Sequence, residues 1–100
     1  MPNPKDLENA HKYSELRKAG EYYEASKIDL SSADLSHANL SGADLTYANL
    51  TYANLSSANL SHADLFHANL TYANLTLANL RGADLEGALI SIGNVNRIIK

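Results

Sequence analysis

Residues 28–47 read IDLSS-ADLSH-ANLSG-ADLTY, and the same five-residue pattern continues without a break in phase to residue 92. The run contains thirteen units. Leucine stands at the centre of the first twelve, and alanine stands two residues before the centre in the last twelve. Asp or Asn precedes the central leucine in units one to twelve. Self-similarity at a fixed period over 65 residues indicates an internal repeat, and the repeat decides the fold.

A period of five suits neither a continuous helix nor a continuous strand. Five residues advance about 500° around an α-helix, so successive leucines would drift away from any common stripe. On one long strand, an odd period would send successive leucines to opposite faces. Within one unit, however, alanine and leucine are two residues apart and share one face of a short extended segment. If a corner follows each segment, the chain coils into a solenoid with leucine and alanine inside.

The tandem A(D/N)LXX pattern resembles the pentapeptide-repeat proteins. This resemblance covers residues 28–92 and implies an all-β solenoid, a right-handed quadrilateral β-helix with four units per coil. The thirteen units then make about three coils. Central side chains twenty residues apart would stack, which predicts a core of four columns. The columns contain Leu30, Leu50, Leu70 and Ile90; Leu35, Leu55 and Leu75; Leu40, Leu60 and Leu80; and Leu45, Leu65 and Leu85.

Residues 1–27 lack the repeat and are predicted to be helical. Asn3 followed by Pro4 is typical of a helix start, and Gly20 is typical of a helix end. The sequence EYYEAS at residues 21–26 can add a short second turn. We predict that this segment caps the first coil, whose open strand edge would otherwise invite aggregation. The side chains expected to cover the coil are Tyr13, Leu16, Tyr22 and Tyr23. A helix that binds a membrane or a partner is the alternative.

Residues 93–100 form a C-terminal tail that follows the repeat and is rich in branched apolar residues. The tail can fold over the last coil as a second cap. Alternatively, two chains can stack end to end there and bury the apolar terminus, and we favour this homodimer. The candidate dimer end consists of Ile92, Val95, Ile98 and Ile99.

Residue types with catalytic or metal-binding chemistry form no recognisable constellation. The chain has no cysteine, and its four histidines lack the spacing of metal ligands. No glycine-rich nucleotide-binding motif occurs, and no nucleophile is paired with a base. Under four units per coil, Asp44, Asp64 and Asp84 form a carboxylate column, and an asparagine column elsewhere (residues 39, 59 and 79) can hydrogen-bond along the stack. A cation on the carboxylates is the alternative to simple solvation. We predict no catalytic, metal or cofactor site.

Aromatic residues gather at neighbouring corners of the expected solenoid. Twenty-residue coils would stack Tyr47 under His67 and Tyr52 under Tyr72, with Phe66 beside the first pair. Together these five residues form a predicted aromatic strip. Aromatic rings on an edge suit a protein partner, because they give contact area at low entropic cost. The alternative is that the rings only stabilise adjacent strands.

Charge separates the remaining hypotheses for function. The chain carries a net charge of −3, and residues 28–92 hold six carboxylates against one arginine, a net of −5. We expect a non-enzymatic, cytoplasmic scaffold for an unknown protein partner, with no cofactor and no direct binding to nucleic acid or membrane. The resemblance offers an alternative, because some pentapeptide-repeat proteins mimic DNA and bind type II topoisomerases. The resemblance also implies a bacterial origin for many members.

Overall fold

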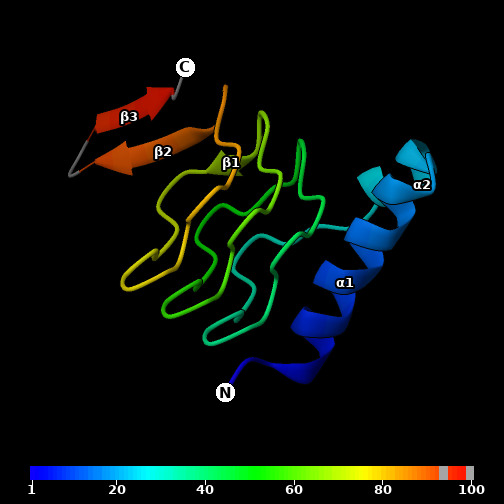
Figure 1. Cartoon of the computed structure of the whole chain (residues 1–100), viewed down its shortest axis with the longest axis horizontal. Coiled ribbons are helices and arrows are strands. Elements are labelled where there is room, and N and C mark those ends of the chain that lie inside the picture. Colours follow the sequence, from blue (N-terminus) through cyan, green and yellow to red (C-terminus); the bar gives the residue numbers. More distant parts are fainter. Residues whose placement is uncertain (93–94, 99–100) are drawn as a thin grey trace.

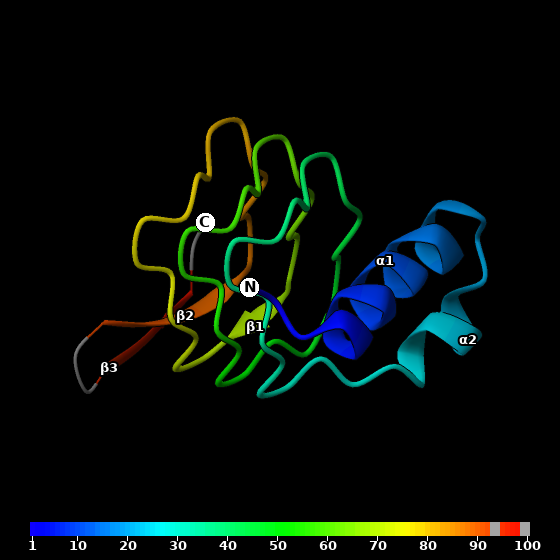
Figure 2. The ribbon, with the colours of Figure 1, turned by 90° about the horizontal axis from the view of Figure 1, so that it is seen from below.

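Backbone pairing between residues 34 and 84 repeats every twenty residues, as four five-residue units per turn require. The computed structural model describes residues 1–92 and 95–98, with side chains through residue 91. Parallel bridges join Asp34 to Asn54, and the same pairing recurs in each unit up to Asp64 with Asp84. The Leu35 N–H donates to the Asn54 carbonyl at 2.8 Å, and the Asn54 N–H donates to the Ala33 carbonyl at 2.8 Å. Successive turns therefore lie directly above one another (Figures 1 and 2).

Each corner is made by two local devices that the pentapeptide supplies. In all twelve Asp- or Asn-containing units, the side-chain Oδ1 accepts the N–H of the residue two positions later, as Asn49 does from Thr51 at 3.1 Å. The fifth residue of each of these units then adopts a left-handed conformation, with φ between 56° and 73°. Gly42 meets this requirement without strain, whereas Tyr47 and most other fifth residues do not.

This geometry corrects the predicted asparagine column. The Oδ1 atoms of Asn39, Asn59 and Asn79 turn back onto their own corners. Within the part of the chain described here, no hydrogen bond joins asparagine side chains of adjacent turns. The physical reason is that an Asx turn is available within the same unit and uses the side-chain oxygen first.

The core consists of the central leucines and the alanines that precede them. Nine central leucines from Leu30 to Leu70 are less than 2% exposed. The last central residues, Leu75, Leu80, Leu85 and Ile90, are only partly buried and pack against this core. The core is therefore closed in its first two turns and open toward the C-terminal end.

Helix α1 (Pro4–Lys18) lies across the N-terminal edge of the solenoid (Figure 2). The Asn3 side chain accepts the N–H groups of Lys5 and Asp6 at its start, and Gly20 follows its end with φ 78°. Both predicted helix boundaries are correct.

Side chains of α1 occupy the hydrogen-bonding positions that a preceding turn would fill. The Asp34 N–H donates to Asp6 Oδ2 at 2.8 Å, and the Asp44 N–H donates to Ser14 Oγ at 2.8 Å. The Tyr13 hydroxyl donates to the Thr46 carbonyl. One turn later, the equivalent Asp64 N–H donates to a backbone carbonyl instead. Helix side chains thus satisfy part of the first strand edge, which leaves fewer free groups for aggregation.

Two of the four side chains predicted to cover the first coil do so. Tyr13 is 3% exposed and Leu16 packs against the core. The prediction is wrong for Tyr22 and Tyr23, which are 58% and 73% exposed. Helix α2 (Tyr22–Ser26) is little more than one turn long and turns the fully buried Ala25 inward, which leaves both rings outside.

The C-terminal segment adds a hairpin to the last turn. Strand β1 (Asn69–Leu70) pairs in parallel with β2 (Leu89–Ile92), and β2 pairs antiparallel with β3 (Val95–Ile98). The sheet order is β1-β2-β3, so β3 lies where a further turn would continue (Figure 1). The side chains of the predicted dimer end lie outside the described part of the structure. They are Ile92, Val95, Ile98 and Ile99. Within residues 1–92 and 95–98, no helix is long and apolar enough to cross a membrane.

Candidate functional site

The exposed aromatic residues sit at the corners because the left-handed fifth position directs their side chains outward. Tyr47 and Tyr52 both have φ 61°, His67 has φ 56° and Tyr72 has φ 60°. The three tyrosines are 50–64% exposed, although they belong to the most regular part of the solenoid. At these three corners, the residue that turns the backbone also exposes its aromatic ring to solvent.

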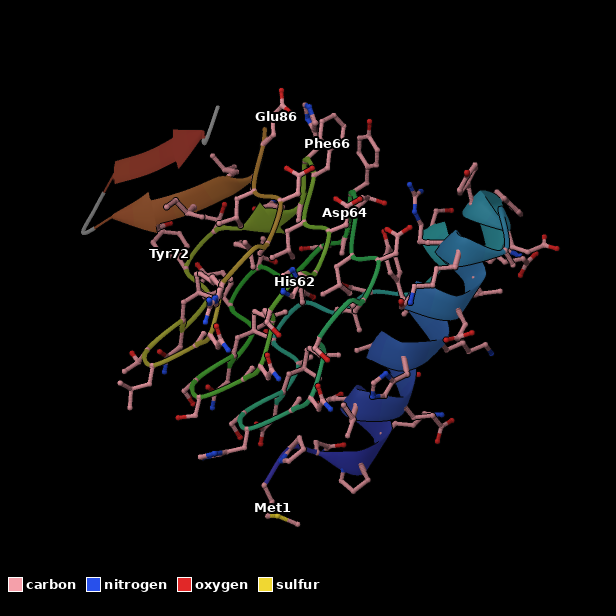
Figure 3. The ribbon with its side chains drawn as sticks, in the orientation of Figure 1. Met1, His62, Asp64, Phe66, Tyr72 and Glu86 are labelled. Atoms are coloured by element: carbon pink, nitrogen blue, oxygen red, sulfur yellow. The ribbon has the colours of Figure 1, made fainter. Side chains whose placement is uncertain are left out.

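The predicted strip forms two ring groups, one at each of two neighbouring corners. Tyr47 stacks on His67 with centroids 5.5 Å apart, and Phe66 meets Tyr47 edge-on at 5.8 Å. Tyr52 stacks on Tyr72 at 5.1 Å. Figure 3 places Phe66 beside Glu86 at one edge and Tyr72 apart from them, near β2. Among the side chains described, no ring contact joins the two groups.

Two glycines in the last turn provide space for histidine rings of the turn before. A Cβ atom at Gly87 would lie 2.6 Å from His67 Nε2, and one at Gly82 would lie 2.5 Å from His62 Nδ1. The His67 ring therefore lies between the Tyr47 ring and the Gly87 backbone. Both glycines also have positive φ, so they meet a conformational and a steric requirement at once.

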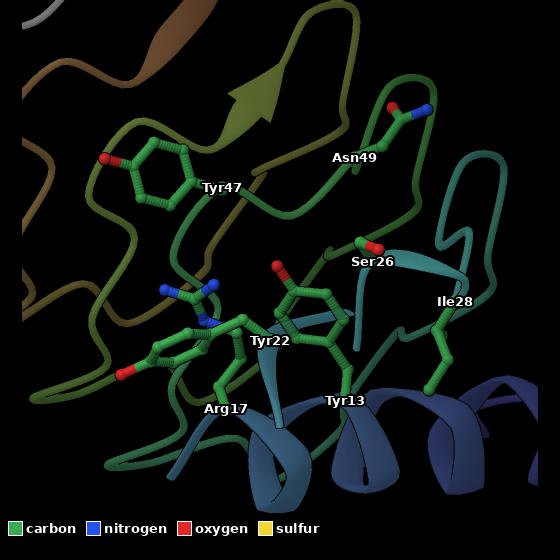
Figure 4. A pocket seen from close by; sticks show the side chains of 7 residues that line it. All are labelled: Tyr13, Arg17, Tyr22, Ser26, Ile28, Tyr47 and Asn49. Atoms are coloured by element: carbon green, nitrogen blue, oxygen red, sulfur yellow. The ribbon is translucent and has the colours of Figure 1, made fainter. Parts of the chain in front are cut away.

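A pocket of about 150 Å³ lies between the N-terminal helices and the first turn (Figure 4). Its lining residues are Tyr13, Arg17, Tyr22, Ser26, Ile28, Tyr47 and Asn49. The Arg17 guanidinium carbon is 4.5 Å from the Tyr22 ring centroid and 5.5 Å from that of Tyr47. Arg17 Nε is 3.8 Å from Asp44 Oδ1. Burial raises the pKa of the Tyr13 hydroxyl above its ordinary value of 10.0, while nearby Arg17 lowers this pKa and Asp44 raises it.

The arginine in this pocket is a residue that sequence reasoning missed. Arg17 follows Tyr13 by four residues, so both side chains lie on the same face of α1. That spacing is a signal that the sequence contained. The third partner, Tyr47, lies thirty residues away from Arg17, and no periodicity connects a helix to a particular corner of a solenoid.

A family model matches residues 26–61 and 58–91 of the chain. The family is described as pentapeptide repeats (8 copies). The chain belongs to the pentapeptide-repeat family. Proteins of this family are generally structural or interaction proteins rather than enzymes. No curated protein sequence matches the chain.

Three solved pentapeptide-repeat structures resemble this chain. One, from the Arabidopsis thaliana thylakoid lumen, is 36% identical with a TM-score of 0.57, over 60% of this chain and 42% of that protein. A second, from the cyanobacterium Cyanothece, is 37% identical with a TM-score of 0.48, over 66% and 51%. A third, from Nostoc, is 41% identical with a TM-score of 0.39, over 73% and 77%. The chain thus spans about half or less of the first two proteins, and the first of them supports the solenoid fold.

The carboxylate column of this pentapeptide-repeat protein is engaged in corner formation. Asp44 Oδ1 accepts the Thr46 N–H and hydroxyl, and Asp64 and Asp84 each accept the N–H two residues later. Among residues whose side chains are described, no group of three or more His, Cys, Asp or Glu is arranged to hold a metal ion. The column's observed role is local hydrogen bonding.

Two other aspartates of the pentapeptide repeats show the electrostatic effect of the same corner. Donation from the Ser31 N–H and hydroxyl lowers the pKa of Asp29 below its ordinary value of 3.8. Donation from the Ser36 hydroxyl and N–H lowers the pKa of Asp34 in the same direction. A charged carboxylate is therefore the form that the corner favours.

Proposed function

We propose that the chain is a rigid, non-enzymatic scaffold that binds a protein partner through the aromatic strip of Tyr47, Tyr52, Phe66, His67 and Tyr72. In this proposal the solenoid is a right-handed quadrilateral β-helix of about three coils, with residues 1–27 as its N-terminal cap. The observation that carries the proposal is the exposed ring stack of Tyr52 and Tyr72, with centroids 5.1 Å apart.

The energetics of this stack support a role beyond stability. A left-handed conformation costs a non-glycine residue about 1–2 kcal/mol. An aromatic pair returns about 0.5–1.5 kcal/mol beyond its buried area. Stacking of Tyr52 on Tyr72 therefore offsets only part of the strain at the two corners, which is about 2–4 kcal/mol together. Gly42 shows that glycine occupies an equivalent position without that strain. Rings that add little stability and remain at least half exposed are suited to contact with a partner.

A matched pair of double variants tests the proposal. Tyr52→Asn with Tyr72→Asn removes the stack and keeps a residue that tolerates positive φ. Ser57→Asn with Leu77→Asn makes the same change one unit further along, at another two corners with positive φ. Proteins captured from the native cell by the wild-type chain are quantified against both variants. We expect the tyrosine variant to lose a partner at least about tenfold, since hot-spot truncations cost 2 kcal/mol or more.

The control variant is expected to retain the same partner, and circular dichroism checks that both variants fold. Equal capture by the wild-type chain and the tyrosine variant would show that the rings have only a structural role. The acidity of residues 28–92 does not favour the DNA-mimic alternative, because a net charge of −5 is small beside one charge per about 1.7 Å of duplex.

A further inference from the structure

The Arg17 guanidinium is a cation without a hydrogen bond in the wall of the pocket. Its side chain is 17% exposed, and its Nε is buried without a hydrogen-bond partner. Nothing in the described part of the chain accepts a hydrogen bond from the other guanidinium nitrogens. The nearest carboxylate oxygen, Asp44 Oδ1, is 3.8 Å from Nε, which is beyond hydrogen-bonding distance. Buried arginine donors are normally satisfied, so this group has donor capacity that the fold does not use.

The hydroxyls of Tyr13 and Ser26 and the side-chain oxygen of Asn49 are already engaged within the protein. The Tyr13 hydroxyl donates to the Thr46 carbonyl, and the Ser26 hydroxyl donates to the Tyr23 carbonyl. Asn49 Oδ1 accepts both the N–H and the hydroxyl of Thr51. Because Arg17 Nε is buried, the terminal N–H groups of Arg17 are the unused charged donors that a ligand in the pocket would meet.

Aromatic rings define the rest of the recognition surface. Figure 4 shows the Arg17 guanidinium between the rings of Tyr22 and Tyr47, with its terminal nitrogens turned toward Tyr47. Contact with both ring faces holds the guanidinium plane and limits its rotation. The pocket volume of about 150 Å³ equals that of an engineered cavity that accepts benzene. The site thus combines an oriented cation with room for a small flat group.

We propose that this pocket binds the carboxylate of a small, flat organic acid through the Arg17 guanidinium. The planar fork of arginine matches a carboxylate with two parallel hydrogen bonds. Asp44 already offsets part of the Arg17 charge, and this favours a monoanion over a phosphate dianion. The ligand's flat part would lie against Tyr22 and Tyr47. This site is separate from the scaffold proposal, although Tyr47 belongs to both surfaces.

Nuclear magnetic resonance of the arginine Nε–Hε groups tests the proposal directly. The chain has three arginines, Arg17, Arg81 and Arg97, so the signals are few enough to assign. The 15N-labelled protein is titrated with sodium benzoate, sodium acetate, sodium phosphate and, at matched ionic strength, sodium chloride. With benzoate, we expect a saturable shift of the Arg17 signal with half-saturation at about 1–10 mM, typical of a ligand of this size. Acetate should bind more weakly, and Arg81 should not shift.

Three variants separate recognition from charge and from folding. Arg17→Lys keeps the charge and loses the planar fork of the guanidinium. The affinity for benzoate, measured from the shifts of the Ser26 and Tyr47 amide signals, should therefore fall at least about tenfold. Tyr22→Ala retains Arg17 and changes an exposed residue, and should weaken benzoate several-fold even if Arg17→Lys misfolds. Arg81→Lys should bind as the wild type does. A response to benzoate no larger than to chloride, unchanged affinity in Arg17→Lys, or tighter binding of phosphate would each overturn the proposal.

Discussion

Replacement of Leu55 by alanine should destabilise the protein far more than the same replacement at Leu75. Both residues belong to one column of the core, with Leu35 at its beginning. Leu55 is fully buried between two turns. Leu75 is only partly buried, and the described residues place no further turn beyond it. The two variants therefore differ in burial and not in chemistry or column.

The expected magnitudes follow from this difference. Leucine to alanine removes three carbon atoms, worth about 0.8 kcal/mol each when buried, or roughly 2.4 kcal/mol. At Leu55 a cavity penalty is added, because backbone hydrogen bonds of 2.8 Å hold the turns on either side and prevent collapse. The total should reach about 3–5 kcal/mol. At Leu75 part of the surface is already in water and solvent can fill the space, so about 1–2 kcal/mol is expected.

Urea denaturation followed by circular dichroism and tyrosine fluorescence measures both free energies of unfolding. Coincidence of the two probes checks that one transition is observed, which repeat proteins do not guarantee. A loss below about 1 kcal/mol for Leu55→Ala would contradict stacking of turns twenty residues apart. Equal losses of unfolding free energy in the two variants would show that the C-terminal end is covered. If the loss for Leu75→Ala rose with protein concentration, a second chain would be identified as the cover.

Four further outcomes are expected. Leu77→Asn should raise the free energy of unfolding by about 1 kcal/mol, since Leu77 is 84% exposed with φ 59° and asparagine tolerates this conformation better; a lower melting temperature would contradict the strain argument. The lowered pKa of Asp34 means that its charged form stabilises the protein above the ordinary pKa of 3.8 and that this contribution disappears as the pH falls through the lowered value. Asp34→Asn keeps the acceptor oxygen and should lose less stability than the wild type in an acid titration below about pH 4; identical acid profiles would count against this cause. On gel filtration, the full chain should elute as a dimer and a chain that lacks residues 95–100 as a monomer, and two monomers would refute the dimer. Tens of micromolar protein should leave the supercoiling activity of DNA gyrase unchanged, and inhibition would instead favour DNA mimicry.

The period of the repeat predicted a solenoid, and the resemblance to pentapeptide-repeat proteins supplied the four units per coil that predict how the turns pair. Alanine recurs every five residues, and so does leucine, without a break in phase. With four units per turn, Asp34 lies beside Asn54 and Asp44 beside Asp64, as the structure shows. The helix boundaries could be predicted for a different reason. Asn3 and Gly20 act locally, and their effects on the adjacent backbone do not depend on the rest of the fold.

Features that depend on competition between partners could not be predicted in the same way. An asparagine can bond along a stack or back onto its own turn, and only the backbone conformation of the corner decides between them. The inward residue of α2 was also unpredictable, because a helix of little more than one turn has no periodic stripe and Ala25 competes with Tyr22 and Tyr23 for the inside. The position of Arg17 over a corner of the solenoid is a tertiary contact that neither segment specifies alone.

The two ends of the solenoid are closed by different chemistry, and this separates the surfaces available to partners. At the first edge, the side chains of Asp6, Tyr13 and Ser14 bond to the strand backbone, so a further strand would have to displace α1. At the last edge, β3 pairs with β2 alone among the strands described in residues 1–92 and 95–98. The outer edge of β3 is therefore a place where an added strand could extend the sheet without displacing α1. The Arg17 pocket adjoins the opposite end, so a dimer formed through the last turn would leave it open.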